Sequence, residues 1–188
     1  MSYANNPVFF VNTTADTSDN IENDGECADA SGKCSLRAAL SETAYADSGI
    51  IKLIGGETYN ITQGDSSSYL AIDATSVHIL TRYNSAGEYD DTVSPAIIER
   101  PNNNGPLLRV KAGTHLQMSY LILRKGFSEN VLNPGGGLHI ENGAMVRGEF
   151  INITENSGVF NCGIGIYNKG KLVLVHTSDD PDHLTRNQ

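Results

Sequence analysis

Basic residues are scarce in this chain of 188 residues. Its 13 lysines and arginines stand against 22 aspartates and glutamates, which gives a formal net charge of −9. A nucleic-acid binder needs clustered basic side chains to neutralise phosphates, and here they are scattered along the chain. We therefore expect no nucleic-acid partner.

Long apolar runs and the pattern of a signal peptide are also missing. No run approaches the roughly 20 apolar residues that cross a bilayer, so we expect no membrane span. Residues 1–7 lack the basic and apolar regions of a signal peptide. Two explanations stay open: a cytosolic protein, or a chain that begins after a removed signal.

The familiar catalytic motifs are absent as well. The sequence contains no Gly-x-Ser-x-Gly, no His-Glu-x-x-His and no phosphate-binding Gly-Lys-Ser/Thr. Tryptophan is absent, whereas 19 glycines, six prolines and many short polar residues are present. This composition favours many short strands joined by turns. With 39% apolar residues, the chain suits one structural domain.

The three cysteines bear on the cellular compartment of the protein, because disulfides persist only where conditions are oxidising. Cys27 and Cys34 flank a polar loop in which Gly32 permits a tight return, so we expect a disulfide and an exported protein. The alternative is two reduced thiols in a cytosolic loop. No paired ligands lie close enough for zinc. Cys162 is left over, and we expect it to be buried, with intermolecular pairing as the alternative.

The segment from Asp16 to Glu26 predicts a solvated acidic loop. Its residues Asn20, Glu22, Asp24 and Gly25 resemble a calcium loop in spacing, but Ser31 stands where the bidentate glutamate is needed. We therefore predict no metal site and no cofactor, and keep calcium as the one candidate.

Residues 1–49 are expected to form an amino-terminal unit. It begins with a strand over residues 8–11 and ends with a helix that Ser35 caps and that runs to Ala44. The helix shows one narrow apolar face, made of Leu36, Ala39, Leu40 and Thr43. Such a face suits a lid over the open end of a β structure.

From residue 50 to the end of the chain we expect parallel strands. Short apolar segments at 50–54, 59–61, 69–72, 77–80 and 96–98 are separated by turn residues. The acidic, glycine-containing stretch from Asn84 to Ser94 is predicted to protrude as a loop.

Two later segments, 108–123 and 138–153, align position by position without a gap. Gly113 matches Gly143 and Tyr120 matches Phe150, and a shorter third copy begins at Ile166. A period near 30 with a glycine turn at constant phase predicts a solenoid, in which each coil is one turn of a parallel β-helix.

This periodicity predicts which side chains point inward and which outward. The inward positions are Leu108, Val110, Leu138 and Ile140. The outward residues form two columns. Within each column, residues of successive coils are expected about 4.8 Å apart. The candidate binding residues are Arg109, His139 and Tyr167 in one column and Lys111, Glu141 and Lys169 in the other. The columns are either a ladder of exposed pairs, worth a few tenths of a kcal/mol each, or a groove for a polysaccharide.

The segment 12–17, Cys27 and the run Cys34–Leu40 resemble the amino-terminal motif of bacterial CSLREA-domain proteins. Residues 135–140 and 163–168 look like the glycine-rich repeats of that family. The resemblance extends to about residue 175 and implies a right-handed parallel β-helix on a secreted or cell-surface protein. The family usually has Glu at the position of Ala38, and usually continues where Thr177–Gln188 abandons the repeat.

These observations leave three hypotheses for function. The first is a non-catalytic extracellular or cell-surface module for adhesion or glycan binding. The second is a polysaccharide lyase or glycoside hydrolase, although Glu141 and Glu149 are expected on different faces and a hydrolase needs carboxylates roughly 5 to 9.5 Å apart. The third is a structural unit that oligomerises through its carboxyl-terminal end.

Overall fold

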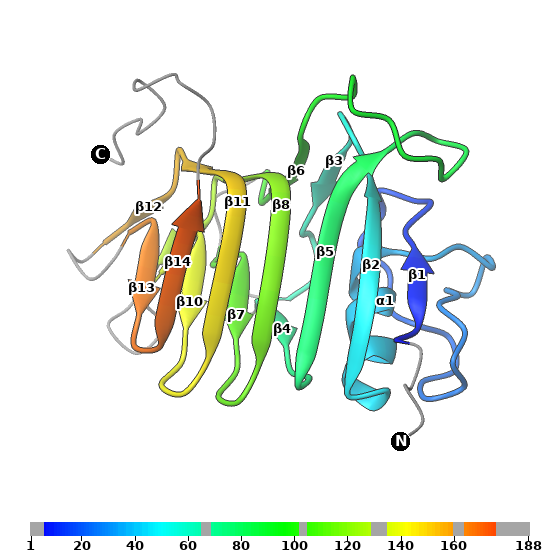
Figure 1. Ribbon diagram of the computed structural model, residues 1–188, viewed down its shortest axis with the longest axis horizontal. Helices are drawn as coiled ribbons and strands as arrows, with labels where there is room; N and C mark the ends of the chain where they lie inside the picture. Colours follow the sequence, from blue (N-terminus) through cyan, green and yellow to red (C-terminus); the bar gives the residue numbers. More distant parts are fainter. Residues whose placement is uncertain (1–5, 65–68, 102–104, 129–134, 160–163, 176–188) are drawn as a thin grey trace.

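The computed structural model describes residues 6–64, 69–101, 105–128, 135–159 and 164–175. Within these ranges the chain consists of short parallel strands and one helix (Figure 1). The helix is α1 (Leu36–Tyr45). The strands are β1 (Val8–Phe10), β2 (Ser48–Ile54), β3 (Thr58–Asn60), β4 (Leu70–Ile72), β5 (Ser76–Tyr83), β6 (Ala96–Glu99), β7 (Leu108–Val110), β8 (His115–Arg124), β9 (Phe127–Ser128), β10 (Leu138–Ile140), β11 (Met145–Thr154), β12 (Ser157–Gly158), β13 (Ile166–Asn168) and β14 (Lys171–Val175).

The strands form three parallel sheets. The largest has the order β1-β2-β5-β8-β11-β14, with β6 joined to β8 and β3 joined to β6. The second has the order β4-β7-β10-β13, and the third pairs β9 with β12. From β7 and β8 onward, neighbouring strands of the two main sheets come from successive copies of the repeat, as the periodicity predicts.

The register confirms the alignment of the two copies. Leu108 lies opposite Leu138, and β8 pairs with β11 at the same offset over almost its whole length. In the third copy Ile166 lies opposite Leu138 and Lys171 opposite Met145. The offset falls there from 28 (166 − 138) to 26 (171 − 145), because the turn that ends at Lys171 is two residues shorter.

The apolar side chains of the repeat fill the interior. Leu108, Val110, Leu138 and Ile140 are all fully buried, which confirms the predicted inward positions. They belong to one continuous apolar core that extends from β1 to β11.

One residue in each long strand bends the backbone. Tyr120 in β8 and Phe150 in β11 both have a left-handed φ of 54°. The bend shifts the alternation, so that Met118 and Leu121, three residues apart, both point inward. As a result, the first half of β8 pairs with β5 and the second half pairs with β6.

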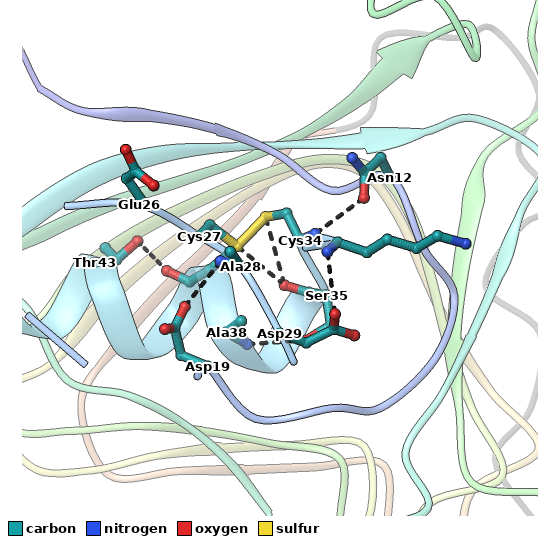
Figure 2. Close-up of a disulfide and its surroundings, with 12 residues drawn as sticks. Asn12, Asp19, Glu26, Cys27, Ala28, Asp29, Cys34, Ser35, Ala38 and Thr43 are labelled. Atoms are coloured by element: carbon teal, nitrogen blue, oxygen red, sulfur yellow. Dashed lines mark hydrogen bonds between the residues drawn. A yellow bond between two sulfur atoms is a disulfide. The ribbon is translucent and has the colours of Figure 1, made fainter. Parts of the chain in front are cut away.

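The predicted disulfide is present between Cys27 and Cys34, beside the start of α1 (Figure 2). The Ser35 hydroxyl accepts a hydrogen bond from the Ala38 amide at 3.0 Å, as expected of an N-cap. The predicted apolar face of α1 is buried, and the helix contacts β2 and β4. β4 is the first strand of the second sheet, and β2 follows β1 at the amino-terminal edge of the largest. The helix thus lies at the amino-terminal end of the sheets.

The acidic loop is solvated only in part. Residues 20–26 are exposed, but the Asp16 side chain is 2% exposed and binds the Arg37 guanidinium at 2.7 and 2.9 Å. The same carboxylate accepts the Thr62 and Gln63 amides. The prediction was wrong for Asp16, because a charge paired in this way can be buried where a free one cannot.

The segment between β5 and β6 extends beyond the sheets, as predicted for Asn84–Ser94 (Figure 1). It returns to the body of the protein through an antiparallel bridge between Tyr83 and Tyr89. Cys162 and the tail Thr177–Gln188 lie outside the described residues.

Candidate functional site

The predicted outward columns lie on the second sheet. The register places Arg109 opposite His139 and His139 opposite Tyr167. The second column follows directly after the strands, where Glu141 donates its amide to Val110 and Lys169 donates its amide to Ile140. The structure therefore brings the predicted residues into two neighbouring columns.

Glu141 is the centre of an ion-pair network. Its carboxylate lies 2.6 Å from Arg109 Nε and 3.4 Å from Lys111 Nζ, and it accepts the Ala112 amide at 3.1 Å. Partial burial raises its pKa, but the hydrogen bonds from Ala112 and Arg109 and the positive charges outweigh that effect, so the pKa of Glu141 lies below its usual value. Arg109 also donates to the Tyr69 hydroxyl at 2.7 Å.

His139 was predicted to be exposed, and this was wrong. It is 7% exposed, because its ring packs edge-on against the Tyr167 ring at a centroid distance of 5.1 Å, between the long side chains of adjacent strands. Burial lowers the pKa of His139, and the charge of Arg109 lowers it further. The Lys169 ammonium lies over the Tyr167 ring at 5.3 Å.

These columns offer little for catalysis. The carboxylate of Glu141 is occupied by its neighbours, and Glu149 belongs to β11 of the other main sheet. Of the two carboxylates considered for a hydrolase, Glu141 follows directly after β10 of the second sheet, whereas Glu149 lies within β11 of the largest.

A group of three carboxylates lies near α1. Asp19, Asp24 and Glu42 place oxygens within 4.8 Å of one another, a spacing that could hold a cation. Of the residues with calcium-loop spacing, only Asp24 belongs to this group. Both oxygens of Glu42 accept loop amides, those of Asn23 and Gly25 at 2.6 and 2.9 Å. These contacts give Glu42 a structural role in fixing the loop on the helix.

A surface pocket of about 370 Å³ lies on the outer side of the large sheet. It forms where the protruding loop returns beside the bends of β8 and β11. Its lining residues are Leu80, Arg82, Tyr83, Tyr89, Ser119, Tyr120, Glu149 and Phe150.

Aromatic rings dominate the pocket. The Tyr120 and Phe150 rings lie 4.7 Å apart, and the Tyr83 and Tyr89 rings meet edge to face at 6.2 Å. Tyr89, at the loop, is 64% exposed. The left-handed φ of Tyr120 and Phe150 turns both side chains outward. The residue before each of them, Ser119 or Glu149, also faces outward. Non-glycine residues in this conformation are strained and are concentrated at functional sites.

The charged side chains at the pocket differ in their contact partners. The Arg82 guanidinium stacks on the Tyr120 ring at 3.4 Å and donates to the Tyr89 hydroxyl at 3.3 Å. Glu149 is bound by Arg147 at 2.8 Å. The Lys52 ammonium lies over the Tyr83 ring at 4.6 Å.

This pocket was not predicted from the sequence, although a signal for it exists. The inward residues of the repeat run 116, 118, then 121, 123, so two consecutive positions must face outward. These are Ser119 and Tyr120 in one copy and Glu149 and Phe150 in the next. What the sequence does not reveal is that the loop after β5 places Tyr89 beside them.

Comparisons with family models, with curated proteins and with solved structures found no match. No helical segment in the described ranges has the length and hydrophobicity needed to cross a bilayer.

Proposed function

We propose that this chain is a non-catalytic, secreted or cell-surface module that binds glycans in the aromatic pocket. The observation that carries the proposal is the convergence of four aromatic rings with hydroxyl, guanidinium and carboxylate groups in one pocket. The C–H-rich face of a sugar ring packs against aromatic side chains, while its hydroxyls take hydrogen bonds from a few polar groups.

The proposed architecture is a right-handed parallel β-helix of the CSLREA type. Three features support it: parallel pairing of β8 with β11 in the register of the repeat, the recurrent bend at Tyr120 and Phe150, and the disulfide beside a capping helix. A disulfide persists in an oxidising compartment, which supports an extracellular location. Solenoids of this kind offer long, regular surfaces for binding.

Binding is better supported than catalysis. The groups considered for a lyase are Arg109, Lys111, His139 and Glu141. Arg109 and Lys111, the candidate bases, form ion pairs with Glu141, and the His139 ring packs against Tyr167. A general base must be free to reach the substrate. Here the carboxylate is occupied and the imidazole is buried.

A glycan array followed by calorimetric titration tests the proposal. Tyr89→Ala removes the exposed ring, and Tyr120→Asn removes the stacked ring while keeping a residue type that tolerates a left-handed φ. We expect each variant to weaken binding of the retained glycan about tenfold, which corresponds to about 1.4 kcal/mol. Tyr45→Ala, which removes a similarly exposed tyrosine from α1, should leave binding unchanged.

Three results would contradict the proposal. The first is that the wild-type protein retains no glycan, and the second is that both pocket variants bind as well as the wild type. The third is turnover of any polysaccharide offered to the protein, which would indicate an enzyme instead.

A further inference from the structure

The pocket contains a cation that lacks a matching acid. Among the charged residues that line it, Glu149 is neutralised by Arg147 through two contacts of 2.8 and 3.2 Å. Arg82, in contrast, forms no ion pair with any carboxylate of the described residues. Its Nε is buried without a hydrogen-bond partner in the same part of the chain.

The acidic loop nearby does not supply the missing partner. Glu88 accepts from the Asn84 side chain at 3.3 Å, and Asp90 accepts from the hydroxyl and amide of Thr92 at 2.6 and 2.9 Å. These hydrogen bonds lower the pKa of Asp90 and keep its carboxylate within its own turn. Lys52, stacked on Tyr83, adds a second cation beside the pocket.

The stacking fixes how Arg82 meets a ligand. The Cζ of Arg82 lies 3.4 Å from the centre of the Tyr120 ring, and its Nη1 donates to the Tyr89 hydroxyl at 3.3 Å, so two contacts hold the guanidinium in place. A planar fork of donors at a fixed angle matches the oxygens of a carboxylate or a sulfate ester. A neutral sugar would leave this donor set without an anionic partner.

We infer that the pocket selects an anionic sugar, a pyranose that carries a carboxylate or a sulfate ester, and that Arg82 binds the anionic group. This inference rests on the proposed glycan binding and adds the ligand's charge. The ring of the sugar packs against Tyr89, and the anionic substituent lies at the edge of the stacked guanidinium.

Matched ligand pairs test the inference by calorimetric titration. One pair is an oligogalacturonate and its methyl ester, which differ in charge but share the sugar ring. The other is a sulfated galactan oligosaccharide and its desulfated form. We expect the wild type to bind the charged member of at least one pair about tenfold more tightly, with a preference that falls as salt is added. The pair that shows the preference identifies the anion.

Two variants test which arginine recognises the anionic group of the sugar. Arg82→Gln should reduce the charged-over-neutral preference to less than about twofold. Arg109→Gln, the same charge change on the second sheet, should leave the preference intact. Thermal unfolding followed by circular dichroism checks that both variants fold.

The outcomes separate this inference from the proposed function. Equal binding of charged and neutral members by the wild type would overturn the inference and leave glycan binding in place, as would an unchanged preference in Arg82→Gln. Loss of the preference in Arg109→Gln would assign the anion to the second sheet and overturn it too. Failure of every oligosaccharide to bind would overturn both.

Discussion

His139 stands between Arg109 and Tyr167 in one row of the second sheet, and its burial gives the protein a pH dependence. The groups that act on it are the cations Arg109, Lys169 and Lys111 and the carboxylate of Glu141. Burial and the cations disfavour the imidazolium, and they outweigh the attraction of Glu141. The imidazole is therefore neutral over a wider pH range in the folded protein than in the unfolded chain.

This lowered pKa predicts a loss of stability on mild acidification. Below the unfolded-state value of about 6.5 the unfolded chain binds a proton that the folded protein resists, so the free energy of unfolding falls until the pH reaches the folded pKa. His139→Gln should show a smaller decrease between pH 7.5 and 5.5 in denaturant titrations than the wild type. The exposed His115→Gln should behave as the wild type, and an identical decrease in both variants would refute this explanation.

At the scale of elements, the cap couples α1 to the first strands. The disulfide closes the loop directly before the helix, and the Asn12 side chain accepts a hydrogen bond from the Cys34 amide at 3.0 Å (Figure 2). Asp16 joins Arg37 of the helix to residues 62 and 63. The pairing of Arg37 with Asp16 gives both residues a structural role.

The double variant Cys27→Ser/Cys34→Ser tests the cap. A disulfide that closes so short a loop is expected to contribute about 2–3 kcal/mol, and its removal should lower the free energy of unfolding by about that amount. Dithiothreitol should destabilise the wild type to a similar extent and leave the double variant unaffected. Equal stability with and without the bond would show that the cap does not depend on it.

The long strands show why part of the site escaped prediction. The alignment placed Tyr120 over Phe150 correctly, and inward positions such as Leu108 and Leu138 followed from periodicity. An aromatic residue is not a sequence signal for a left-handed φ, since glycine and asparagine usually occupy that conformation. The left-handed conformation of these residues therefore could not be predicted from their identity, although the break in the apolar alternation marks its position.

At the scale of the whole molecule, periodicity predicted which strands pair but not the side-chain contacts between the copies or with the loop after β5. The alignment of the two long copies with the shorter third copy is enough to predict that Arg109, His139 and Tyr167 are neighbours. It cannot predict that His139 is buried, because burial depends on the side chains packed around it. Nor can it predict that Tyr89 returns to Tyr83, since the loop has no counterpart in the other copies.

The central claim, that glycans bind on the bend of the large sheet, is tested most directly by NMR. Isotope-labelled wild-type protein would be titrated with the oligosaccharide that the array selects. We predict that the largest shift changes fall on Tyr83, Tyr89, Tyr120 and Phe150, and that Arg109, His139 and Tyr167 stay unperturbed. Changes confined to the row of Arg109, His139 and Tyr167 would contradict the account.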